Sequence, residues 1–120
     1  MRHWNLSEVD TAEGTRSPVV LHSSDGVRRI VVIGLGAGEA LGDHQVKESA
    51  LVLVLDGSAR VEAGDDAVDA GPGELFEFDH DEQHSVTSDE GARLLLLLAP
   101  WPGEGHYRGE RDFRRGVSAS

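Results

Sequence analysis

The sequence predicts an all-β domain, a sandwich or a barrel, and three observations support this prediction. Short runs rich in apolar and β-branched residues recur at spacings of about 8–12 residues, with glycine or aspartate turns between them. No segment shows the sustained apolar spacing of an amphipathic helix. The 15 glycines in 120 residues are typical of many turns, and this length fits one domain with a core of its own.

The composition divides the chain into an N-terminal arm (1–17), a barrel (18–99) and a C-terminal tail (100–120). The arm is polar, with apolar anchors such as Trp4. Pro100 ends the last strand, because proline cannot continue a central ladder. The tail mixes aromatic residues with prolines, glycines and charges. We expect it to dock on the outside of the barrel, and a lid over the barrel mouth is the alternative.

Within the barrel, runs bounded by turn residues are expected to be strands. They cover residues 18–22, 27–35, 41–46, 67–70 and 74–78. Two further pairs of runs are expected to be hairpins.

The first expected hairpin covers residues 50–63, where an apolar run meets Asp56-Gly57 and then an alternating run. The second joins residues 85–87 to 92–99 around the turn Ser88-Asp89-Glu90-Gly91. Both predictions rest on turn residues placed between two strand-like runs.

Two of the expected strands, 51–55 and 94–98, are apolar on both faces. A strand with one wet face should alternate, so both faces of these strands need cover. If Ala50 faces inward, Val52 does too, and the intervening leucines face outward. We expect a second copy of the chain to cover the outward face, giving a homodimer. The N-terminal arm or the C-terminal tail are alternatives.

Charge and composition exclude several partners. A formal net charge of −11 argues against nucleic acid, which attracts basic patches. No run reaches the ~18 apolar residues of a membrane-spanning helix. The N-terminus lacks an apolar secretory segment, so a cytoplasmic location is expected. Without cysteine, any metal would need histidine and carboxylate ligands.

The stretch 71–88, GPGELFEFDHDEQHSVTS, places His84 after an acidic loop at the start of a strand. With the preceding hairpin region, it resembles two motifs of the cupin superfamily, G(X)5HXH(X)3-4E(X)6G and G(X)5PXG(X)2H(X)3N. In the second motif Gly73 and His84 are kept, while Asp79 stands for the proline and Asp81 for the inner glycine. Ser88 takes the place of the asparagine.

The resemblance covers residues 27–99 and implies a double-stranded β-helix, the jelly-roll barrel of small single-domain cupins. It places His44 on the first ligand histidine, Val46 on the second and Ala50 on the glutamate. The metal site is therefore expected to be degenerate, since two imidazoles alone leave most of a coordination sphere empty. A ligand pocket is expected from residues at these positions and the next inward position. They are His44, Val46, Ala50, Val52 and His84.

Two functions follow from the resemblance. The favoured one is binding of an unidentified small molecule, without a cofactor and without robust enzymatic activity. The alternative is a metal-dependent oxygenase or isomerase, whose site is rebuilt from His44, Glu48 and His84 around iron, manganese, nickel or zinc. His80 and Glu82 could also approach the site, although a solvated loop is the more ordinary place for them.

Overall fold

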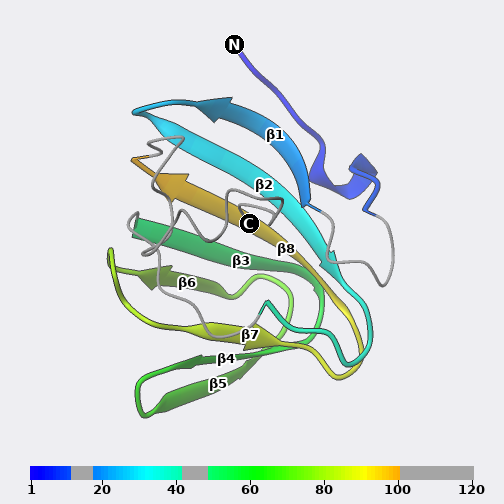
Figure 1. Ribbon diagram of the computed structural model, residues 1–120. Coiled ribbons are helices and arrows are strands. Elements are labelled where there is room, and N and C mark those ends of the chain that lie inside the picture. The colour runs from blue at the N-terminus through cyan, green and yellow to red at the C-terminus, as the bar shows by residue number, and fades with distance from the viewer. Residues whose placement is uncertain (12–17, 42–48, 101–120) are drawn as a thin grey trace, which may run out of the picture.

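The computed structural model describes residues 1–11, 18–41 and 49–100, and it confirms the all-β prediction (Figure 1). The arm contains a short 3-10 helix, η1 (Leu6–Glu8). The strands are β1 (Pro18–Ser24), β2 (Arg28–Leu35), β3 (Ser49–Gly57), β4 (Ala59–Ala63), β5 (Asp66–Ala70), β6 (Leu75–Phe78), β7 (Ser85–Thr87) and β8 (Ala92–Ala99). The expected strand at 41–46 and the expected docking of the tail fall largely or wholly outside the described residues.

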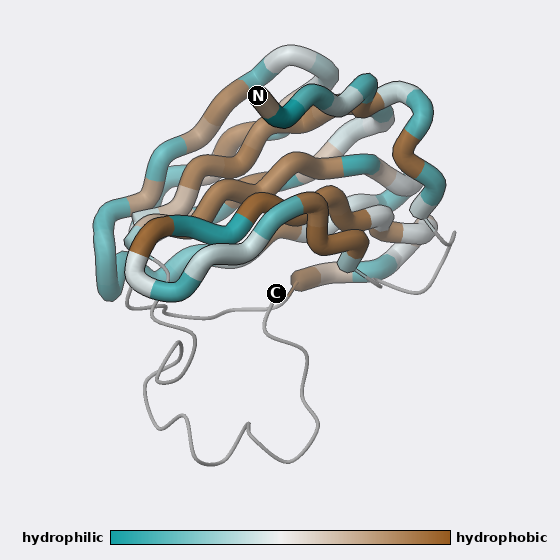
Figure 2. The backbone as a smooth tube through the Cα atoms, turned by 90° about the horizontal axis from the view of Figure 1, so that it is seen from above, coloured by the Kyte–Doolittle hydropathy of each residue, from teal (hydrophilic) through white to brown (hydrophobic). Residues whose placement is uncertain are grey.

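The strands form two antiparallel sheets. The larger has the order β1-β2-β8-β3-β6, and the smaller has the order β5-β4-β7. Their inner faces enclose one apolar core, and Figure 2 shows hydrophobic residues running along these strands. This two-layer arrangement is that of the double-stranded β-helix which the resemblance implies.

Burial alternates along the strands as the parity argument predicts. Ala50, Val52 and Val54 are at most 3% exposed and belong to the core, while the leucines between them are half-buried. Strand β8 alternates in the same way, with Leu94, Leu96 and Leu98 in the core. The inward direction of Ala50 and Val52 is therefore confirmed.

Both hairpin predictions were wrong. Strand β3 pairs with β6 and β8, whereas β4 pairs with β5 and β7 in the other sheet. Strands β7 and β8 likewise belong to different sheets. The connections at Gly57 and at Ser88–Gly91 carry the chain from one sheet to the other, and they do not turn it back on itself.

The two crossings lie against each other, which explains their glycines. Gly57 has φ +80° and Gly91 has φ +107°. A Cβ at Gly57 would overlap the carbonyl oxygen of Gly91, and the amide of Ser58 donates to that oxygen at 3.2 Å. The Ser88 hydroxyl donates to the Ser58 carbonyl oxygen at 2.6 Å and accepts from the Gly91 amide at 2.8 Å. These contacts hold the two crossings together at one end of the barrel.

The outer face of the larger sheet is apolar and partly covered. Val32 is fully buried but lies outside the core cluster, so it is covered from outside. The arm is anchored near there. The Arg93 guanidinium donates to the carbonyl oxygens of Leu6 at 2.7 Å and Val9 at 2.8 Å. Residues 1–11 of the arm thus form a 3-10 turn against the sheet.

Candidate functional site

His84 lies inside the barrel at the end opposite the two crossings. It is 4% exposed, and it has the same strand parity as the core residue Val86. In Figure 1 this end holds the β4–β5 turn, the β6–β7 connection and the last residues of β8. The connection before His84 therefore decides where the imidazole lies.

The acidic loop that precedes His84 is a compact turn. The Glu82 amide donates to the Asp79 carbonyl oxygen at 3.0 Å, and the Asp79 amide donates to the Glu82 carboxylate at 3.0 Å. Asp81 has φ +65°, at the position where the motif resemblance has a glycine. Aspartate tolerates this left-handed conformation better than most residues. The substitution thus keeps the turn, and the turn delivers His84 into the barrel.

Two contacts fix the imidazole of His84. Its ring stacks on Phe78 with centroids 4.0 Å apart and planes 4° apart. Its Nδ1 lies 3.1 Å from the Glu82 carbonyl oxygen. A carbonyl oxygen only accepts, so Nδ1 carries a hydrogen. In the neutral ring Nε2 is then the nitrogen without one.

The wall beside His84 is apolar. Phe78 pairs with Ala50, which pairs in turn with Leu98 on β8, and all three are at most 6% exposed. In the next layer inward, Val52 lies between Leu96 and Phe76. The structure thus brings Ala50, Val52 and His84 to one end of the interior. The other predicted site residues, His44, Val46 and Glu48, lie outside the described ranges.

Arg29 is a residue of this end that sequence reasoning missed. Its Cα partner on β8 is Leu98, so it shares the inner face with Leu98 and Ala50, and its Nε atom is buried. The signal was present, because Arg29 has the same parity as Val31. Beside Arg28 it looked like an ordinary polar start to a strand.

The described residues offer little to a metal ion. At Ala50 a methyl group stands in the core where the resemblance has a carboxylate. Across residues 1–11, 18–41 and 49–100, no three His, Asp or Glu side chains form a group suited to a metal. His84 supplies one imidazole. The predicted set of His44, Glu48 and His84 stays a prediction, since two of its members fall outside those ranges.

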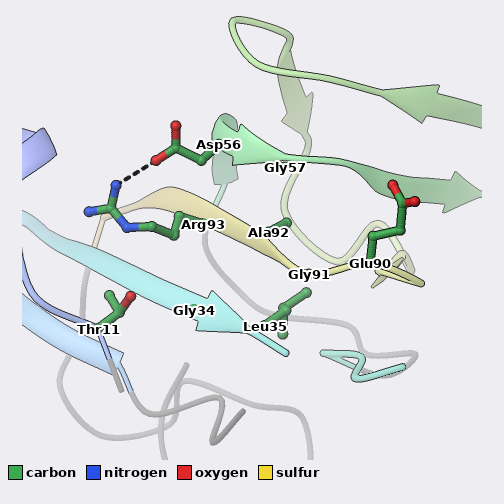
Figure 3. A pocket seen from close by; sticks show the side chains of 9 residues that line it. All are labelled: Thr11, Gly34, Leu35, Asp56, Gly57, Glu90, Gly91, Ala92 and Arg93. Carbon is green, nitrogen blue, oxygen red and sulfur yellow. Dashed lines mark hydrogen bonds and ion pairs between the residues drawn. The ribbon is translucent and has the colours of Figure 1, made fainter. Parts of the chain in front are cut away.

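Hollows lie near both ends of the part of the barrel that the structure describes. One of about 540 Å³ is lined by the β4–β5 turn and by Gln83 and Ser85, whose strand parity is opposite to that of the buried His84, so it opens on the outer side of the smaller sheet. The other, of about 310 Å³, lies at the opposite end between Thr11 of the arm and the sheet (Figure 3). There Arg93 is directed to Asp56, with Nη1 donating to Oδ2 at 2.8 Å. The second hollow accompanies the docking of the arm. Neither hollow is lined by His84, Ala50 or Val52.

The chain is similar to known ligand-binding domains. The family described as the AraC-like ligand binding domain matches residues 32–100. No curated protein matches the chain. No helix among the described residues is long and apolar enough to cross a membrane.

Solved structures share the fold. The TT1209 protein of Thermus thermophilus is 21% identical with a TM-score of 0.73, covering 85% of this chain and all of that one. A cupin superfamily protein of Desulfitobacterium hafniense is 20% identical with a TM-score of 0.70, covering 77% of this chain and 84% of that one. Oxalate decarboxylase of Bacillus subtilis, described with Mn(II) centres, is 32% identical with a TM-score of 0.58. It covers 61% of this chain, which matches 21% of that one.

Proposed function

The chain belongs to the AraC-like ligand-binding domains of the cupin superfamily, and we propose that it binds a small, largely apolar molecule beside His84. One observation carries the proposal. A buried imidazole, fixed by Phe78 and the Glu82 carbonyl, stands beside a wall formed by Ala50 and Leu98. Ligand pockets usually combine such apolar walls with a few positioned polar groups.

The small side chain at Ala50 supports this proposal. It lies in register with Phe78, the residue on which His84 stacks. A methyl group there occupies less space than the carboxylate side chain that the cupin motif has. The neighbours of Ala50 in the row, Phe78 and Leu98, present only carbon to it. Apolar parts of a ligand would gain about 25 cal/mol for each Å² removed from water there.

The test compares two alanine-to-leucine variants. Ala50→Leu fills the proposed pocket and should weaken binding of 3-phenylpropan-1-ol at least about tenfold, a change of about 1.4 kcal/mol. Ala67→Leu changes an exposed alanine of β5 and should leave binding unchanged. Binding is measured by ¹⁵N–¹H NMR titration, and circular dichroism checks the fold. Equal binding by both variants and the parent chain would place the site elsewhere.

The metal-dependent enzyme remains the second candidate. The likeness to an oxalate decarboxylase described with Mn(II) centres favours it. Protein loaded separately with iron, manganese, nickel and zinc and then dialysed would distinguish the two. Near-stoichiometric metal that is lost in His84→Ala would favour the metal-dependent enzyme over the metal-free binding domain. Metal that stays after this substitution would lie at another site.

We also propose that the chain forms a homodimer through the outer face of the larger sheet. Half-buried leucines of β3 and β8 gather on that face, and Leu75 on β6 is 61% exposed. The arm is anchored at one end of the face, through Arg93. A second copy would cover the rest. A cytoplasmic location and the absence of a nucleic-acid partner remain predictions.

A further inference from the structure

Arg29 directs a cation toward the barrel interior at the end where His84 lies. In β2 it has the parity of the core residue Val31, and it pairs with Leu98 on β8. Its Nε atom is buried. Arg28, its neighbour in sequence, has the opposite parity and belongs to the outer face. One arginine of this pair therefore faces the core, and the other faces away from it.

One row of paired residues joins Arg29 to the imidazole. It runs from Arg29 through Leu98 and Ala50 to Phe78, on which His84 stacks. Three steps between neighbouring strands separate the Cα atoms at its ends by about 14 Å along the sheet. The long arginine side chain shortens the gap to His84 further. A molecule of a few carbon atoms is long enough to span it.

The chemistry of this row favours a ligand that carries a negative charge. A guanidinium stays protonated at every physiological pH, and a charge near an apolar core is stable only beside an anion or good acceptors. Arg29 already interacts within the chain. Its fork carries five N–H donors, so a chain partner and a ligand can share it. A carboxylate can accept two parallel hydrogen bonds from one guanidinium group.

We infer that the ligand is a small amphipathic carboxylic acid. Its carboxylate binds Arg29, its apolar body lies along Leu98 and Ala50, and a second polar group, where present, meets His84. This inference rests on the proposed function, because it names the ligand class of the same site. The formal net charge of −11 gives the rest of the chain little attraction for an anion, so the preference depends on this one residue.

The experiment titrates the full chain with two probes that share one apolar body. 3-Phenylpropionate and 3-phenylpropan-1-ol are added at pH 7, and Kd is obtained from ¹⁵N–¹H NMR shifts. The carboxylate should bind about tenfold to a hundredfold more tightly, as expected for a hydrogen-bonded charge. Arg29→Gln should bring the carboxylate to the Kd of the alcohol and leave the alcohol unchanged.

Two further variants complete the design. Arg28→Gln removes the outward-facing neighbour and should keep the full preference. Arg29→Lys keeps the positive charge but lacks the planar guanidinium, so it should bind the carboxylate more tightly than the alcohol by a smaller factor. This variant also carries the test if Arg29→Gln fails to fold. Equal binding of both probes to the parent chain would overturn the inference and leave the proposed function standing. Binding of neither probe would overturn both. A loss of both probes in a folded Arg29→Gln chain would assign Arg29 a structural role and overturn the inference.

Discussion

At the scale of single residues, Gly57 has the most demanding position in the barrel. Its φ of +80° is a conformation that side chains with a Cβ rarely adopt, and an added Cβ would lie 2.9 Å from the Ala92 Cα and overlap the Gly91 carbonyl oxygen. Backbone atoms cannot move aside as a flexible side chain can. Gly57→Ala should therefore lower the free energy of unfolding by about 3 kcal/mol or more, measured by urea denaturation.

Gly26→Ala provides the matched control for this prediction. Gly26 has φ +78°, nearly the same conformation, but nothing lies within 4 Å of a Cβ placed there. Its substitution should cost about 1 kcal/mol, the strain of the conformation alone. If both variants lost the same free energy, the contact with Gly91 would contribute nothing to the requirement for glycine.

The residues of the site differ in how well the sequence predicts them. The motif resemblance placed Ala50 at a ligand position, strand parity added Val52 to the same face, and both residues are buried. Asp81 was matched to a motif glycine, and its φ of +65° lies in the left-handed region that glycine adopts readily. Arg29 was missed, because a charge at the first inward position of a strand looks like its solvated start. Only the pairing of β2 with β8 shows that Arg29 lies beside Leu98 on the inner face.

At the scale of elements, local turn residues predicted where strands end but not which strands pair. Asp56-Gly57 between two strand-like runs is typical of a hairpin, yet β3 already has β8 and β6 on its two sides. The register shift between Val54 and Asp56 bends β3 there, and the chain leaves the sheet. This choice depends on long-range pairing, which residues near the turn do not encode.

Arg93 connects the arm to the larger sheet. Its Nη2 donates to the carbonyl oxygens of Leu6 and Val9, its Nη1 donates to Asp56, and its side chain is 22% exposed. Arg93→Met should release the arm and lower the free energy of unfolding by about 1–3 kcal/mol. Hydrogen exchange should quicken at the Val9 amide, which now donates to the Leu6 carbonyl oxygen at 3.3 Å.

Arg60→Met is the control for this release. Arg60 pairs with Asp69 and Glu62, but its side chain is 50% exposed, so the loss should stay within about 1 kcal/mol. Exchange in the arm should not change in this variant. Unaltered exchange at Val9 in Arg93→Met would show that other contacts hold the arm in place.

At the scale of the whole molecule, the outer face of the larger sheet is the surface through which we expect two copies of the chain to associate. Leu53 lies on that face in register with Leu95 on β8 and the exposed Leu75 on β6. A stable interface buries about 800 Å² on each partner, and an apolar row of this kind can form its centre. Light scattering at micromolar concentration should therefore give twice the 12.9 kDa of one chain.

A lysine in that row tests whether a second copy of the chain covers the apolar face. Leu53→Lys should give monomers, because it would bury an unpaired charge between two copies while leaving the core face of β3 unchanged. Val68→Lys alters a residue of the smaller sheet that is 41% exposed, and it should keep the dimer. A monomeric mass for the parent chain would contradict the dimer. The half-buried leucines would then have to be covered by other parts of the same chain.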